Sequence, residues 1–204
     1  SRVMPVASTM GRGGLFAAND TARAARFRFD YVMVIDPSVS SPAVNHLRVT
    51  ELMYEPTGGI NLEFVELVNT GNTPLNLDGV SFDGGDPFDA FTFSALTLDP
   101  DEHAVLVADT ATFQAEYGGA VRIMGEWTGG SLSNSGEKIV LRDDAGDIIH
   151  DFNYDTVAPW PVTPAGQGPS LEVIDIEGDY NDPANWRASA VVGGTPGAGV
   201  LLDT

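Results

Sequence analysis

The sequence contains no cysteine and only one lysine, Lys138, among its 204 residues. Without cysteine the chain forms no disulfide, and it supplies neither a thiolate metal ligand nor a thiol nucleophile. No apolar run approaches the roughly 18–20 residues that a membrane-spanning helix requires, so we expect no membrane insertion. The glycine patterns of P-loops, of dinucleotide sites and of the GxSxG hydrolase elbow are also missing. These absences count against the common thiol, nucleotide-binding and serine hydrolase chemistries.

Basic charge is scarce and is concentrated at one end of the chain. There are 29 acidic and 10 basic side chains, with a formal net charge of −19. Residues 1–28 hold five of the arginines and one aspartate, so residues 29–204 carry 28 acidic and five basic side chains, a net charge of −23. Such a surface repels phosphate backbones, which proteins bind with clustered lysine and arginine. We therefore expect no nucleic-acid partner, and we interpret the acidity as favouring solubility or, alternatively, the attraction of cations.

Composition divides the chain into an extension, a linker, one domain and a tail. Residues 13–35 contain two apolar runs around a polar turn, which predicts a β-hairpin within an N-terminal extension over residues 1–35. Residues 36–46 are rich in proline and serine and predict a linker. The domain follows at 47–199, and 200–204 form a tail. Nine short β-rich runs lie at 47–54, 62–69, 75–82, 90–93, 103–108, 122–127, 138–142, 148–154 and 170–175.

Short strands at this spacing predict an all-β fold, either a sandwich or a barrel. One helix is expected at residues 111–117, capped by Asp109 or Thr110 and ended by Gly118. The pair Asp182 and Pro183 predicts one further helical turn, because aspartate caps helices and proline favours their first position.

Two glutamates, Glu51 and Glu66, lie among apolar residues of predicted strands. Strict alternation places Glu51 on one face with Leu47, Val49 and Met53. An ionised carboxylate there is costly unless it is paired or hydrogen-bonded, or unless a bulge frees it. Three hypotheses remain: a general acid/base pair, metal ligands, or structural carboxylates that accept hydrogen bonds from backbone N–H groups or arginine. We favour the structural hypothesis, because the sequence places no nucleophile or histidine beside the pair.

The segments LRVTELMYEP and EFVELVNTGNTPLNLDGVSF resemble the opening of bacterial lamin-tail domains. The similarity continues through HAVLVAD, SLSNSGEKIVLRDDAGDIIHDFNY, WP, GQGPSLEVID and the NW…GGTPG pattern, so that it covers residues 47–199. Glu55, where the family usually has asparagine, and Pro169 are minor departures. This resemblance implies an immunoglobulin-like β-sandwich of about nine short strands. It also supports a structural role for Glu51 and Glu66, because the family is not known for catalysis at these positions.

A separate resemblance covers the N-terminal extension. The segments GGLFAAND and FRFDYVMV are similar to the last two strands of concanavalin-like jelly-roll domains. This resemblance implies that residues 13–35 are the end of an upstream domain. The alternative is a hairpin that packs on the sandwich as an extra edge.

Aspartate-rich loops offer candidate calcium ligands. Calcium takes six to eight oxygen ligands, which closely spaced carboxylates can supply. The loops FDGGDPFDAF and IEGDYNDP have this composition, although neither has the twelve-residue EF-hand pattern. We interpret a third acidic segment, RDDAGDI, as a hairpin turn. The candidate metal ligands are Asp83, Asp86, Asp89, Glu177, Asp179 and Asp182.

Three tryptophans, Trp127, Trp160 and Trp186, admit two hypotheses. They could form a ligand-binding platform for sugar rings, with Trp160 in the loop VAPWPVTP. A large aromatic side chain between packed loops more often closes the end of a sandwich core. We keep both hypotheses and favour core closure.

Together these features predict a non-catalytic interaction or structural module of a larger exported or cell-surface bacterial protein. The chain begins at Ser1 without an initiator methionine, so we expect any export signal to lie upstream. The expected partners are neighbouring domains of the same polypeptide and a surface protein or glycan, with no cofactor required. The alternative is a calcium-assisted carbohydrate-binding module that uses the acidic loops and Trp160. A hydrolase that uses Glu51 and Glu66 is the third hypothesis.

Overall fold

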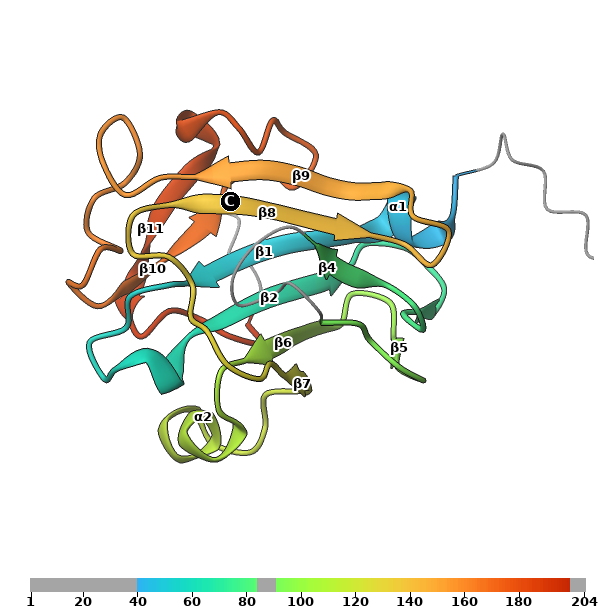
Figure 1. The fold of residues 1–204 in the computed structure, drawn as a ribbon, viewed down its shortest axis with the longest axis horizontal. Helices are drawn as coiled ribbons and strands as arrows, with labels where there is room; N and C mark the ends of the chain where they lie inside the picture. Colours follow the sequence, from blue (N-terminus) through green and yellow to red (C-terminus); the bar gives the residue numbers. More distant parts are fainter. Residues whose placement is uncertain (1–39, 84–90, 199–204) are drawn as a thin grey trace, which may run out of the picture. The chain divides into compact units, whose positions relative to one another are not determined.

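A computed structural model describes residues 40–83 and 91–198, which form an all-β, immunoglobulin-like sandwich. A six-stranded sheet with the order β11-β10-β1-β2-β6-β7 packs against a three-stranded sheet with the order β4-β8-β9 (Figure 1). Strands β3 and β5 form a separate pair. In the described part of the chain, no helix is long and apolar enough to cross a membrane. The predicted hairpin at 13–35 lies outside the described residues.

The strands are grouped below by the sheet to which they belong. The large sheet consists of β1 (Leu47–Met53), β2 (Phe64–Asn69), β6 (His103–Val107), β7 (Ile123–Glu126), β10 (Pro169–Val173) and β11 (Trp186–Val192). The smaller sheets consist of β4 (Ser81–Asp83), β8 (Glu137–Arg142), β9 (Ile148–Tyr154), β3 (Leu75–Asn76) and β5 (Thr97–Leu98). The helices are α1 (Pro42–His46) and α2 (Thr110–Tyr117), and single 3₁₀ turns lie at η1 (Ile60–Leu62) and η2 (Pro183–Asn185).

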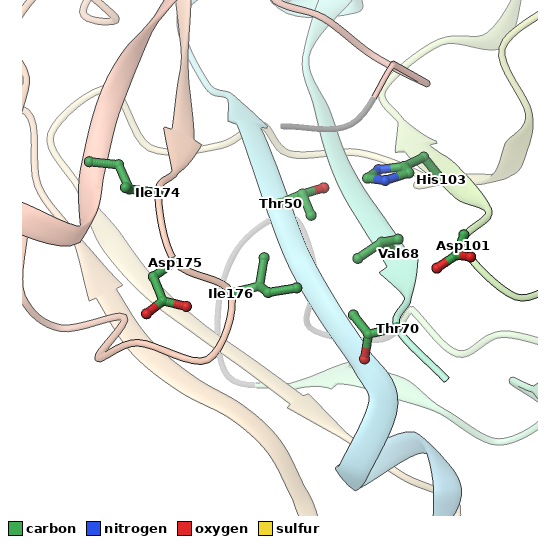
Figure 2. A pocket seen from close by; sticks show the side chains of 8 residues that line it. All are labelled: Thr50, Val68, Thr70, Asp101, His103, Ile174, Asp175 and Ile176. Carbon is green, nitrogen blue, oxygen red and sulfur yellow. The ribbon is translucent and has the colours of Figure 1, made fainter. Parts of the chain in front are cut away.

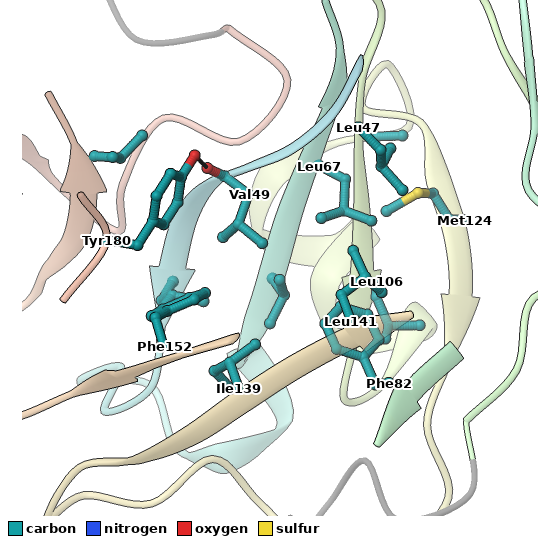
Figure 3. Close-up of a cluster of buried hydrophobic side chains, with 14 of the residues drawn as sticks. Leu47, Val49, Leu67, Phe82, Leu106, Met124, Ile139, Leu141, Phe152 and Tyr180 are labelled. Carbon is teal, nitrogen blue, oxygen red and sulfur yellow. Dashed lines mark hydrogen bonds between the residues drawn. The ribbon is translucent and has the colours of Figure 1, made fainter. Parts of the chain in front are cut away.

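The hydrophobic core lies between the large sheet and the three-stranded sheet. Figure 3 shows Val49 and Leu67 of the large sheet facing Ile139, Leu141 and Phe152 of the smaller one, and all five side chains are buried. Alternation along each strand directs every second side chain into this space. Full burial of each such side chain contributes about 1.5–3 kcal/mol to folding, so this layer is the main source of stability.

A β-bulge in β1 decides which way Glu51 points. The register with β2 shifts between Val49 and Glu51, so Leu47, Val49 and Leu52 face the core while Glu51 faces outward. Strict alternation, which placed Val49 and Glu51 on one face, is therefore wrong for β1. An extra residue in a strand reverses the alternation after it.

Two core side chains satisfy the backbone of β1 next to this bulge. The N–H of Val49 donates to His150 Nε2 over 3.2 Å, and the Tyr180 hydroxyl donates to the Val49 carbonyl over 2.7 Å (Figure 3). Burial lowers the pKa of His150 to about 3, so the imidazole is neutral and its Nε2 accepts the hydrogen bond. The core therefore contains a neutral histidine as a backbone partner.

Helix α2 links two parallel strands, β6 and β7, at one end of the large sheet. The carboxylate of Asp109 accepts the N–H of Thr112 over 2.7 Å and caps the helix, which ends at Gly118 with φ +80°. This agrees with the predicted helix. Phe113 packs edge-on against Phe64 with ring centroids 5.7 Å apart, so α2 covers part of the outer face of the sheet.

Several predicted boundaries differ from the structure. The run at 75–82 is divided between β3 and β4 by a turn, in which the N–H of Val80 donates to Leu77 O and Gly79 adopts φ +82°. Residues 42–46, predicted as linker, form α1. Of the run at 90–93, only Thr92 forms a bridge within the described residues. Strands β5 and β11 were missed, the latter because the signal at Asp182 and Pro183 favoured a turn, which is present as η2.

Candidate functional site

The outer face of the six-stranded sheet, which is turned away from the core, carries three consecutive rows of side chains. In the first row, Met53, Phe64 and Val107 lie in register on β1, β2 and β6. They pack with Phe113 of α2 in a second, smaller apolar cluster. This row is therefore covered by the helix.

The second row consists of three glutamates, Glu172, Glu51 and Glu66, which we call the glutamate row. Glu51 on β1 is the register partner of Glu172 on β10 and of Glu66 on β2. All three residues are at most 4% exposed. Carboxylates on strands about 4.8 Å apart repel one another and lose their hydration on burial. The row therefore requires its own hydrogen-bond donors.

Residues 193–198, which we call the C-terminal strap, supply donors to this row. The N–H of Thr195 donates to Glu51 Oε1 over 2.9 Å, and the N–H of Gly197 donates to Glu66 Oε2 over 2.5 Å. The Thr195 hydroxyl lies 3.3 Å from Glu51 Oε2 and 3.1 Å from Glu172 Oε1. The strap thus lies over the row and is bonded to each of its members.

The glycines of the strap permit this close approach. Gly194 has φ +80°, and a Cβ atom added to it would overlap Glu51 Oε1 and crowd the Ser170 hydroxyl. Residues with a side chain rarely adopt this backbone conformation. The GGTPG segment of the sequence therefore lies in close contact with the buried carboxyl groups.

The three glutamates differ in their remaining partners. Glu172 Oε2 accepts from Arg187 Nε over 3.0 Å. Glu66 Oε1 accepts from the Thr50 hydroxyl over 2.7 Å and lies 3.0 Å from His103 Nδ1. Among the described residues, Glu51 has no arginine or histidine partner like those of Glu172 and Glu66, and burial, followed by the charge of Glu66, raises its pKa to about 8. Glu51 therefore keeps its proton at neutral pH, which relieves the repulsion within the row.

A carboxyl group with a pKa near neutrality is suited to proton transfer, but only if a substrate reaches it. Glu51 and Glu66, the predicted pair, are brought together in register. They line neither the cavity of about 420 Å³ nor the cavity of about 520 Å³ described next. The geometry is therefore that of buried, hydrogen-bonded carboxyl groups.

The third row of the outer face lies along a cavity of about 420 Å³. The cavity is lined by Thr50 of β1, by Val68 of β2 and by Thr70 directly after it. Residues 174–176 lie on one side, and Asp101 and His103 lie on the other (Figure 2). Val68 of β2 and His103 of β6 are register partners. They lie two residues along their strands from Glu66 and Val105, which are also register partners, so this row is next to the glutamate row. This row thus combines aliphatic side chains with hydroxyl, imidazole and carboxylate groups.

A second cavity, of about 520 Å³, adjoins the first at Asp101 and His103. It is lined by residues 101–103, by residues 120–122 and by strap residues 196–198. We call the two cavities together the outer groove. The groove crosses the strands of the large sheet beside the strap.

The groove is acidic, and its surroundings offer no spare positive charge. Asp101 and Asp175 are exposed on opposite sides of the first cavity, which no lysine or arginine lines (Figure 2). In residues 40–83 and 91–198, every lysine and arginine already forms an ion pair. The pairs are Arg48–Glu177, Arg122–Glu102, Lys138–Asp151, Arg142–Asp83 and Arg187–Glu172.

A family model described as Lamin Tail Domain matches residues 40–156, which is more than half of the chain. The chain belongs to the lamin tail domain family. Lamin tail domains are non-catalytic, immunoglobulin-like domains. No curated protein and no solved structure matches the chain significantly. The family match ends before β10, β11 and the strap, which complete the large sheet and the glutamate row of this lamin tail domain.

This lamin tail domain buries all three tryptophans. Trp127 and Trp186 are almost fully buried, and Trp160 is 9% exposed. Trp160 and Trp186 lie with ring centroids 5.9 Å apart, and all three belong to the main core cluster. A sugar platform requires an open ring face. Because the three rings are buried, the structure agrees with the core-closure hypothesis and not with the platform hypothesis.

The first acidic loop is only partly described. Asp83 forms an ion pair with Arg142, with 2.9 Å between Oδ2 and Nε. Asp86 and Asp89 lie outside the described residues, so calcium binding by this loop stays a prediction.

The acidic side chains of the third loop have protein partners. Glu177 pairs with Arg48 over 3.3 Å. Asp179 and Asp182 each accept the N–H of the residue two positions later, at 2.8 and 2.9 Å. Across the described ranges, no three acidic or histidine side chains come together as a metal site. These carboxylates therefore hold turns and an ion pair.

Several residues of the site were not predicted from the sequence. Glu172 belongs to the segment SLEV, in which the alternation of side chains would have placed it on the face that points away from the core. Thr195 was noted only as part of GGTPG, and Asp101 and Asp175 were not singled out. The expectation that no histidine lies beside the pair was wrong, because His103 Nδ1 lies 3.0 Å from Glu66 Oε1. The partners of Glu51 and Glu172 lie up to 144 residues away along the chain, a separation that local patterns do not reveal.

Proposed function

We propose that this lamin tail domain is a non-catalytic interaction module of a larger exported or cell-surface bacterial protein. Its partners would be a surface protein or glycan, together with neighbouring domains of the same polypeptide. The observation that supports the proposal is the contrast on the outer sheet face. The glutamate row is covered by the strap, whereas the groove beside it is open and has the mixed polar and apolar lining of a binding surface.

The hydrolase hypothesis has less support. Glycosidases place two carboxyl groups beside a space that holds the substrate. All four carboxyl oxygens of Glu51 and Glu66 lie within hydrogen-bond distance of a donor in the protein. The calcium-assisted carbohydrate hypothesis loses its aromatic platform, because Trp160 packs against Trp186 in the core.

Glycan and peptide arrays test the interaction role, with two matched variants of the whole chain. Ile174→Arg places a bulky side chain in the groove, where Ile174 is 42% exposed, and Ile148→Arg makes the same change on β9, where Ile148 is 49% exposed. We expect a ligand that the wild type and Ile148→Arg retain and that Ile174→Arg loses. Silence on both arrays, or equal binding by the two variants, would contradict the groove as the interaction surface.

An activity screen tests the non-catalytic part of the proposal. Chromogenic glycosides, esters and phosphate esters are incubated with the wild type and with Glu66→Gln. We expect no turnover by either protein. Turnover by the wild type that Glu66→Gln abolishes, with an unchanged circular dichroism spectrum, would assign catalysis to the glutamate row.

A further inference from the structure

We infer that the outer groove binds an extended basic peptide segment in which two lysine or arginine side chains stand four residues apart with an aliphatic side chain midway between them. This inference rests on the proposed function and names the chemical class of the partner.

The dimensions of the groove favour an extended chain over a small molecule. Its first cavity reaches from residues 174–176, at the end of β10, across β1 and β2 to β6 (Figure 2). Three strand spacings of about 4.8 Å make this distance roughly 14 Å, and an extended peptide rises about 3.3 Å per residue. Four residues therefore span the first cavity, and the second cavity continues the path beyond His103 along the strap.

The charges at the two ends of the first cavity favour basic side chains there. Asp175 stands at one end and Asp101 at the other, and within the described residues neither belongs to an ion pair. Because every lysine and arginine of the described domain is already paired, the net charge of −23 over residues 29–204 is uncompensated within the domain. Complementary charge on a partner speeds encounter and selects the binding register.

The lining between the two aspartates favours an aliphatic side chain. Val68 and Ile176 line the cavity between its acidic ends. In an extended peptide, residues i, i+2 and i+4 point to the same side. A peptide with basic residues at i and i+4 therefore also presents residue i+2 to this apolar lining, where an aliphatic side chain is stabilised by burial.

His103 offers a further polar contact from the side wall. Its Nδ1 lies 3.0 Å from Glu66 Oε1, and its imidazole ring lines both cavities. The glutamate row thus orients a group of the groove without touching the ligand.

The test uses the full chain and a labelled peptide containing the sequence Lys-Thr-Val-Thr-Lys. A rearranged peptide of the same composition, Lys-Lys-Thr-Val-Thr, controls for net charge, and a peptide with glutamate in place of lysine controls for sign. Fluorescence anisotropy gives the dissociation constants at low and high salt. We expect the spaced peptide to bind about five-fold more tightly than the rearranged one and to weaken in salt, because exposed charges are screened.

Two variants of the groove and one matched control complete the test. Asp101→Asn and Asp175→Asn should each weaken binding about three-fold, whereas Asp147→Asn, the same charge change in the β8–β9 turn, should leave it unchanged. Both groove variants suit the local backbone: asparagine tolerates the φ of +56° at position 101, and its carbonyl oxygen replaces the Asp175 oxygen that accepts the N–H of Glu177. Unchanged circular dichroism and melting temperature confirm the fold.

The possible outcomes separate this inference from the proposed function. Equal affinity for the spaced and rearranged peptides, or equal effects of Asp101→Asn and Asp147→Asn, would overturn the inference. A glycan that binds the wild type and is lost in Ile174→Arg would overturn it while leaving the interaction role in place. Silence of both peptides and glycans would overturn the two together.

Discussion

Two neighbouring rows on one sheet face differ in what covers their side chains. In the glutamate row, three carboxyl groups are buried, whereas one pleat further along Ile174 is 42% exposed. Residue type alone predicts the opposite, since glutamate is among the residues least often buried. The difference lies in what covers each row: the strap supplies N–H and hydroxyl donors to the glutamates, and the other row lies along an open cavity. The covering segment therefore makes the burial of the three carboxyl groups possible.

The largest effect is expected from a substitution that displaces the C-terminal strap from the glutamate row. Gly194→Ala places a methyl group where Glu51 Oε1 now lies, in a backbone conformation that alanine disfavours. We expect the free energy of unfolding to fall by about 4 kcal/mol, because the buried carboxyl groups lose their donors as well. Urea unfolding followed by tryptophan fluorescence measures this change.

Gly118→Ala is the matched control for that substitution. Gly118 has the same φ of +80°, but a Cβ atom there would meet no atom within 4 Å. Its cost should be limited to backbone strain of about 1–3 kcal/mol. Equal losses for the two variants would show that the strap's approach to Glu51 contributes nothing.

The second prediction concerns the proton on Glu51. The folded carboxyl group keeps its proton up to about pH 8, whereas the unfolded one loses it near its ordinary pKa of 4.5. Between these values the folded state binds more protons, so the free energy of unfolding falls as pH rises. We expect a loss on the order of 3 kcal/mol between pH 5 and pH 8, and Glu51→Gln should remove most of this slope.

Urea unfolding at several pH values checks this prediction, with the exposed Glu116→Gln as control. Glu63 adds a smaller slope of the same sign, since burial raises its pKa to about 7. An unchanged slope in Glu51→Gln would mean that Glu51 is ionised in the folded protein.

The third prediction compares an aliphatic residue of the glutamate row, which the strap covers, with one that lines the open groove. Val105 is buried beside Glu66 in the covered row, so Val105→Ser should lower the free energy of unfolding by about 3 kcal/mol. Ile174→Ser removes a larger side chain from the open groove and should cost less than about 0.5 kcal/mol. Melting temperatures of both variants rank the effects, and the reverse order would mean that the groove is closed in solution.

The fold class could be predicted because the strand pattern and turn residues are local properties. Most of the nine predicted runs became strands, and the helix capped by Asp109 was found where expected. Two strands, β5 and β11, were not predicted, and local features of the sequence explain why. Strand β5 is only two residues long, and β11 follows the capping signal at Asp182.

The candidate site was less predictable because its parts are far apart in the sequence. The apolar neighbours of Glu51 and Glu66 indicated unusual carboxyl groups. The bulge that turns Glu51 outward depends on strand register, which side-chain alternation does not reveal. The groove depends on how β6 and the loop after β10 meet across β1 and β2, which only the assembled sheet determines.

The strap also sets how the domain responds to mechanical load. Its contacts with the glutamate row follow one another along the segment, with Gly197 bound to Glu66, and Thr195 bound to Glu51 and Glu172. A pull from the C-terminal side loads Gly197 first and Thr195 only after that bond has opened. The segment therefore peels bond by bond at low force, whereas the interior ladders of β1 with its neighbours share tension among many bonds at once.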